Sequence, residues 1–73
     1  MRTLEVEVMV PSGRRFTEGV EELARGAGTV REALYAFPCG TFLYDTPERT
    51  GDAEARIAHL FGENEVVTCR QRY

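Results

Sequence analysis

The stretch "GTVREALYAF", residues 28–37, carries the clearest helix signal in this chain. Thr29 is followed three residues later by Glu32, the spacing of a capping box in which each side chain bonds the other residue's free backbone N–H. Four apolar residues then recur at helical spacing and form one stripe: Val30, Ala33, Leu34 and Phe37. Pro38 would end the helix, because the residue before a proline disfavours helical geometry. The pattern predicts the main helix over residues 30–37.

A strand precedes this helix at the start of the sequence. Its apolar residues alternate with polar ones, as in a strand with one buried face: Leu4, Val6, Val8 and Val10. Residues 11–13, Pro-Ser-Gly, then favour a tight hairpin turn, since proline presets the first turn position and glycine accepts positive φ. A second strand is expected from Arg14 to about Glu18. Val20, Leu23 and Ala24 have helical spacing, but Gly26 and Gly28 would each destabilise a helix by about 1 kcal/mol relative to Ala, so residues 19–28 are expected to be a short turn or the ragged end of that strand.

Three short elements are expected in the middle of the chain. Residues 41–45 are predicted to form a strand with Phe42 and Tyr44 on one face and Leu43 on the other. Residues 46–48, Thr-Pro-Glu, favour a brief helical turn. A second apolar stripe at helical spacing follows, before a glycine at position 62 that would cap the helix: Ala53, Ile57, Leu60 and Phe61.

The last strand is predicted over residues 65–73. Alternation would place three side chains on its inner face: Val67, Cys69 and Tyr73. The other face would carry four: Val66, Thr68, Arg70 and Arg72. The predicted order within one domain, residues 1–73, is therefore strand, strand, helix, strand, short helix, strand.

This order resembles the β-grasp or ubiquitin-like fold, whose small members have about this length. The Thr-Val pair in residues 28–37 is similar to the start of the single helix in the thiamine sulfur carrier, the molybdopterin-synthase small subunit and TGS domains. The stretch "FGENEVVTCRQRY", residues 61–73, is similar to the turn that leads into the last strand of those carriers. The resemblance implies an α+β domain with one main helix packed on one face of a mixed sheet. If residues 17–37 instead form one long helix, a ferredoxin-like α+β sandwich is expected.

The C-terminal sequence departs from the carriers that the fold resembles. Sulfur carriers and ubiquitin-type modifiers end in a flexible Gly-Gly whose carboxylate is adenylated, whereas this chain ends in Gln71-Arg72-Tyr73. Without that tail there is no acyl group to activate. A non-enzymatic binding module is therefore expected, with no cofactor.

Composition narrows the class of partner. The chain has nine Arg, no Lys and twelve Asp and Glu, for a net charge of −3, and its basic residues form no block that could follow a phosphate backbone. Nucleic acid is therefore not expected as a direct ligand. The sequence has no apolar run suited to a signal peptide or a membrane span, which predicts a cytoplasmic protein with reduced cysteines and no membrane partner.

The residues that usually carry chemistry are few. His59 is the only histidine and is expected to be a solvated surface residue. A zinc site is not expected, since there is no Cys-x-x-Cys pair, and no other metal site is expected. Cys69 is expected to be a small buried hydrophobic residue, and Cys39, within a Pro-Cys-Gly sequence, is the better candidate for a reactive thiol.

The face of the sheet without a helix is the candidate binding surface. In the β-grasp arrangement the first and last strands are parallel neighbours, so Glu5 and Glu7 would form a ladder of opposite charges with Arg70 and Arg72. Met9, Leu43 and Val66 would share this face as a small apolar patch ringed by charge, which is typical of protein interaction surfaces. The candidate binding residues are thus Met9, Leu43, Val66, Arg70 and Arg72.

The leading hypothesis is a non-enzymatic protein-binding domain, acting as an adaptor, accessory subunit or inhibitor. One alternative is a small acidic inhibitor of phage type that occupies a basic nucleic-acid-binding surface on a host protein, through Glu18, Glu21, Glu22, Glu63 and Glu65. Another is a thiol-dependent accessory or sulfur-relay component that uses Cys39. A homodimer formed through a sheet edge or face is a further hypothesis.

Overall fold

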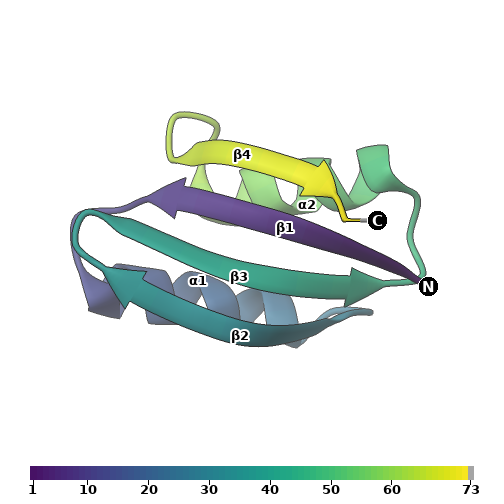
Figure 1. Ribbon diagram of the computed structural model, residues 1–73, viewed down its shortest axis with the longest axis horizontal. Helices are drawn as coiled ribbons and strands as arrows, with labels where there is room; N and C mark the ends of the chain where they lie inside the picture. Colours follow the sequence, from purple (N-terminus) through teal and green to yellow (C-terminus); the bar gives the residue numbers. More distant parts are fainter. Residues whose placement is uncertain (73) are drawn as a thin grey trace.

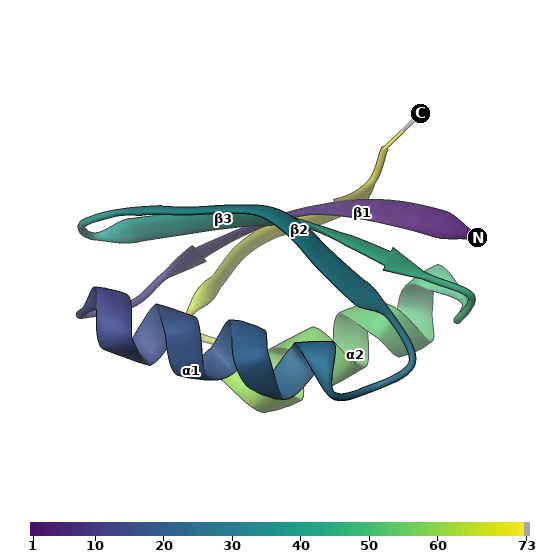
Figure 2. The ribbon, with the colours of Figure 1, turned by 90° about the horizontal axis from the view of Figure 1, so that it is seen from below.

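The structure is a computed structural model and describes residues 1–72. It has six elements: β1 (Arg2–Met9), α1 (Gly13–Ala24), β2 (Thr29–Ala36), β3 (Cys39–Thr46), α2 (Thr50–Phe61) and β4 (Val66–Gln71). The strands form one antiparallel sheet in the order β2-β3-β1-β4 (Figure 1). Both helices lie in a second layer against one face of this sheet (Figure 2). The predicted α+β class, with a sheet covered by helix on one face, is confirmed.

The order of the elements along the chain differs from the predicted one. It is β-α-β-β-α-β, and with this strand order it is the ferredoxin-like arrangement named as the alternative, although the long helix over residues 17–37 on which that alternative rested is absent and its residues are divided between α1 and β2. The first and last strands are neighbours, as expected, but they run antiparallel rather than parallel. The sheet is therefore not mixed, and two helices of equal length cover it.

Helix α1 occupies residues that were predicted to form a hairpin turn and a second strand, so the prediction of a strand over residues 14–18 is wrong. Ser12 is the N-cap, and its side-chain oxygen accepts a hydrogen bond from the backbone N–H of Arg15 at 3.1 Å. The inward side of the helix carries residues at helical spacing: Phe16, Gly19, Val20 and Leu23. The glycines at positions 26 and 28 follow the helix, so they do not interrupt it.

Strand β2 occupies the residues that were predicted to form the main helix, so the prediction of a helix over residues 30–37 is wrong. Val30 and Tyr35 pack against the core, while Leu34 is 69% exposed. The register shifts between Arg31 and Leu34, where β2 has one residue more than β3, and Glu32 adopts a positive φ of 55°. Because of this bulge, the two inward side chains of β2, Val30 and Tyr35, are five positions apart, and the alternation of a regular strand is lost. The apolar residues of this stretch then recur at the spacing of a helix.

Most of the remaining elements follow the prediction. The four alternating residues of the first strand are buried, and Phe42 and Tyr44 face the helices while Leu43 faces the other way. In α2, Ala53, Ile57 and Phe61 are buried, and a glycine at position 62 ends the helix. The helical turn expected over residues 46–48 is wrong, because Thr46 still belongs to β3. The predicted orientation of Tyr73 lies outside the described residues.

Three phenylalanines connect the two helices to the sheet. The ring centroids of Phe16 and Phe42 are 6.2 Å apart, those of Phe16 and Phe61 are 6.4 Å apart, and those of Phe42 and Phe61 are 5.9 Å apart. Phe16 lies directly on β3 at Gly40, where an added Cβ would be 2.3 Å from the Phe16 ring. Gly40 therefore provides the space in which the first helix meets the sheet.

Arg15 fixes the end of this helix to its neighbour. Its Nη2 donates to the carbonyl oxygens of Leu60 at 3.2 Å and Phe61 at 3.1 Å, and it lies 2.7 Å from a carboxylate oxygen of Glu65. The guanidinium carbon also lies 5.4 Å from the centre of the Phe61 ring. One side chain thus satisfies carbonyls at the end of α2 and holds it against the start of α1.

The contact at Gly40 can be tested by adding one methyl group. We expect Gly40→Ala to lower the free energy of unfolding by about 2 kcal/mol, because the Phe16 ring must move in a packed core. Gly51→Ala is the control for an added methyl group without a clash, since nothing lies within 4 Å of its added Cβ, and because Ala favours the helix that Gly51 belongs to, it should leave the stability unchanged or raise it by up to about 1 kcal/mol. Urea unfolding followed by circular dichroism measures both. A Gly40→Ala variant that is as stable as the wild-type protein would contradict the placement of α1 on β3.

Candidate functional site

The candidate site is the sheet face opposite the helices. Outward side chains on neighbouring strands are aligned in rows by the strand register. Three rows cross the middle of the face: Ala36, Cys39 and Met9; then Leu34, Thr41, Glu7 and Thr68; then Arg31, Leu43, Glu5 and Arg70. No element within residues 1–72 covers these rows (Figure 2).

Met9, Leu43 and Val66 do not form the predicted apolar patch. Met9 is 51% exposed and is the cross-strand partner of Cys39, four residues along β3 from Leu43, or about 13 Å. Leu43 is only 8% exposed, between Glu5 and Arg31. Val66 packs against the core on the covered face. These three residues therefore cannot act together on one partner.

The misplacement of Val66 has a local cause. Glu7 pairs with Thr68 but Val8 pairs with Val66, so Val67 is an extra residue in β4. This bulge reverses the alternation at the start of the strand. Val66 consequently faces the helices, and Val67 is 48% exposed in its place.

A different apolar cluster occupies one end of the face. It lies at the β2–β3 turn and the end of β1, and we call it the apolar end: Leu34, Ala36, Cys39 and Met9 on the face, with Phe37 in the turn between Ala36 and Cys39. Leu34 and Phe37 are 69% and 73% exposed. Sequence analysis missed both because it assigned them to a buried helix stripe. The cap at Ser12 before the Phe16, Val20 and Leu23 spacing was the signal that would have moved the helix and left these residues in a strand.

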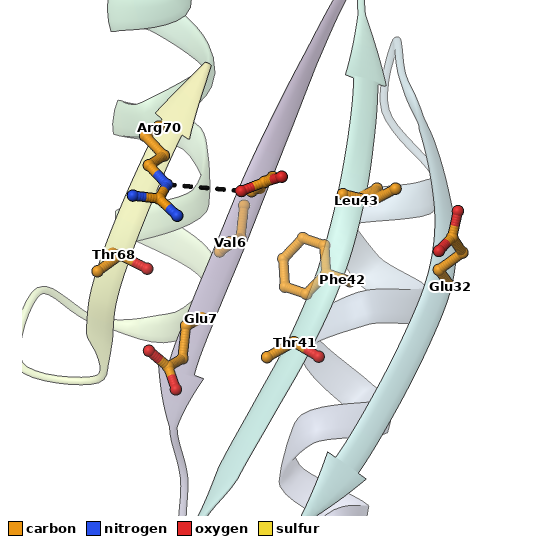
Figure 3. A pocket seen from close by; sticks show the side chains of 9 residues that line it. Val6, Glu7, Glu32, Thr41, Phe42, Leu43, Thr68 and Arg70 are labelled. Atoms are coloured by element: carbon orange, nitrogen blue, oxygen red, sulfur yellow. Dashed lines mark ion pairs between the residues drawn. The ribbon is translucent and has the colours of Figure 1, made fainter. Parts of the chain in front are cut away.

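Beside the apolar end, the centre of the face is hollowed and acidic. The hollow has a volume of about 360 Å³, and Glu5, Glu7, Thr41, Thr68 and Arg70 are among its lining residues (Figure 3). Its outer limit on β2 is Glu32.

The predicted charge ladder is present at Glu5. Nε of Arg70 lies 3.5 Å from one of its carboxylate oxygens, and Nε of Arg72 lies 3.6 Å from the other. Glu7, by contrast, has no ion-pair or hydrogen-bond partner for its side chain within residues 1–72. The ladder therefore neutralises one of the two predicted acids and leaves the other available.

The opposite end of the face is closed by its own interactions. Arg31 Nε lies 2.6 Å from a carboxylate oxygen of Asp45, and the Thr3 hydroxyl donates to the other oxygen at 2.5 Å. The hydrogen bond from Arg31, followed by that from Thr3, lowers the pKa of Asp45 below its usual value. These groups already satisfy one another, so the open chemistry of the face lies in its apolar end and its acidic centre.

The five acids of the alternative hypothesis are spread over α1 and the segment after α2. Glu18 pairs with Arg14 at 3.6 Å, Glu22 pairs with Arg25, and Glu65 pairs with Arg15. Only Glu21 and Glu63 lack an ion pair among the described residues. Arginines thus interrupt this acidic surface.

The two cysteines are free and lie on opposite faces of the sheet. Cys69 packs against the core but is half-buried rather than buried as predicted, and partial burial, assisted by the charge of Glu54, raises its pKa to about 11. Cys39 is half-buried in the apolar end. His59 is exposed on α2.

Two further observations concern residues 1–72 as a whole. No three His, Cys, Asp or Glu side chains in this range are grouped so that they could hold a metal ion. Neither helix has the length and apolar character needed to cross a membrane.

Comparisons with protein-family models, curated proteins and solved structures find no match to this chain. Function is therefore inferred from the chemistry of the open face.

The two thiols should differ in reactivity. At about pH 8 only about one in a thousand Cys69 side chains is a thiolate if its pKa is about 11, so a disulfide reagent should modify Cys39 first. We expect one thiol to react in the folded protein and the second only in denaturant, with Cys39→Ser removing the fast phase.

The same raised pKa has a consequence for stability. The folded state holds the Cys69 proton more tightly than the unfolded state, so the stability that this proton contributes is complete below the ordinary thiol pKa and is lost as the pH rises toward about 11.

For the reactivity experiment, equal modification rates for the two thiols at neutral pH would contradict the burial of Cys69.

Proposed function

We propose that this protein is a non-enzymatic binding domain that engages another protein through the open face of its sheet. The observation that carries the proposal is the apolar end, where Leu34 of β2 and Met9 of β1 are 69% and 51% exposed on either side of β3, and Phe37 in the adjoining turn is 73% exposed. Large apolar side chains gathered on one surface and bordered by charge are typical of protein interaction sites. Burying them against a partner removes apolar area from water, which is the main driving force of such association.

The composition of the face favours a protein partner over a nucleic acid. Sheet surfaces that bind single-stranded RNA stack bases on aromatic side chains of the central strands. Here the outward positions of β1 and β3 carry no aromatic residue, and two of them are the acids Glu5 and Glu7. Those carboxylates would repel a phosphate backbone.

The two alternative functions have less support. An acidic inhibitor would present an unbroken acidic surface, whereas three of the five proposed acids pair with arginines. A sulfur relay needs a nucleophilic thiolate, and Cys39 has no arginine or histidine among its cross-strand neighbours Ala36 and Met9.

The proposal can be tested with a charge placed on the apolar end. Met9→Glu/Leu34→Glu should abolish capture of a partner from a lysate of the source organism, because a carboxylate would be desolvated in the interface. Both side chains are exposed, so the fold should persist, as circular dichroism can verify. Capture at low salt and at about 0.5 M NaCl separates apolar from purely electrostatic binding.

The control is Ala55→Glu, which adds one negative charge, half of that added by the double variant, to an exposed position on α2 in the other layer. We expect wild type and Ala55→Glu to retain the same partner at both salt concentrations. A partner that both variants retain, or that only Ala55→Glu loses, would overturn the proposal. Loss in high salt alone would favour the acidic inhibitor.

A further inference from the structure

We propose that the partner is a segment of another protein that places an arginine or lysine side chain on Glu7 and an apolar side chain on the apolar end. This inference rests on the proposed function and specifies the chemistry of the partner. It uses the acidic centre of the face, which apolar docking alone leaves unexplained.

One uncompensated carboxylate in the hollow favours a cationic ligand. Three acids line the hollow, Glu5, Glu7 and Glu32, and three arginines balance them in number, so the negative charge is local rather than spread over the hollow. Glu5 is already shared by two arginines, and Glu32 pairs with Arg31 at 3.1 Å. Glu7 is the half-buried carboxylate without an ion pair within the described residues.

The surroundings of Glu7 suit a guanidinium or ammonium group. Figure 3 shows it on β1 between Thr41 of β3 and Thr68 of β4, which are its cross-strand partners. Their exposed hydroxyl oxygens can accept further hydrogen bonds from a ligand that has several N–H donors. A cation at this point would meet one full negative charge and two neutral acceptors.

The spacing of the two features sets the form of the ligand. Glu7 and Met9 are two residues apart on the same face of β1, which corresponds to about 6.8 Å along a strand. In an extended segment, side chains at positions i and i+2 are separated by the same distance. A basic residue and an apolar residue two positions apart therefore match Glu7 and the apolar end together.

The edges of the sheet favour docking on the face over strand addition. Both edge strands contain a bulge, at Arg31–Leu34 in β2 and at Val67 in β4. Bulges interrupt the row of free backbone groups that an incoming strand would need. A second copy of this chain joined edge to edge is therefore the less favoured occupant.

A displayed library of random peptides tests the inference directly, because it samples many spacings of basic and apolar residues at once. Peptides are selected on the wild-type protein, and their dissociation constants are measured on wild type, Glu7→Gln, Glu21→Gln and Leu34→Glu. Glu7→Gln keeps the size of the side chain, and Glu21→Gln removes an exposed acid from α1, on the other layer. Sedimentation of wild type alone shows whether it self-associates.

We expect selected peptides to be enriched in Arg or Lys two positions from an apolar residue, and to bind Glu7→Gln about fivefold more weakly than Glu21→Gln. Peptides that require Leu34 but bind Glu7→Gln as tightly as wild type would refute this inference and leave the proposed function standing. Peptides insensitive to both positions, or none at all, would count against both. A dimer that Leu34→Glu dissociates would identify a second copy as the occupant.

Discussion

The close approach of Phe16 to the backbone of Gly40 is the constraint on which the rest of the structure depends. An added Cβ at Gly40 would be 2.3 Å from the ring, so only glycine lets α1 lie this near to β3. From there the ring reaches Phe42 in the sheet and Phe61 in α2, and Arg15, one residue earlier, holds the end of α2. Both helices therefore pack against the same face of the sheet, and the other face remains open.

Sequence patterns predicted the elements whose periodicity is unbroken and missed those in which it is not. In β1 and β3 every second side chain is buried, and in α2 the buried residues keep helical spacing, so these three elements were identified. In β2 the bulge near Glu32 destroys the alternation, and Thr29 and Glu32 then imitate a capping box. In α1 the helical spacing was set aside because of Gly26 and Gly28, which lie after the helix, whereas Gly19 within it leaves space for the Phe61 ring.

The same bulges decide how much of the binding face could be foreseen. The pairing of Glu5 with Arg70 and Arg72 followed from alternation together with the β-grasp resemblance, which makes the first and last strands neighbours, and it survives although those strands run antiparallel. Val66 was placed on the wrong face by one extra residue, and Leu34 and Phe37 were hidden in a supposed helix. An insertion in a strand leaves no mark in composition, so only the three-dimensional register shows which apolar residues meet the solvent.

The direction of β1 also separates the chain ends from the apolar end. The strand runs from Arg2 toward Met9, and the backbone N–H of Arg72 donates to the carbonyl of Thr3 at 2.8 Å, so both ends of the described chain lie at the end of the sheet opposite the β2–β3 turn (Figure 1). Anything tethered to either end would therefore extend away from Leu34 and Phe37. A tether at either chain end would therefore leave the apolar end, on the opposite side of the domain, free to contact a partner.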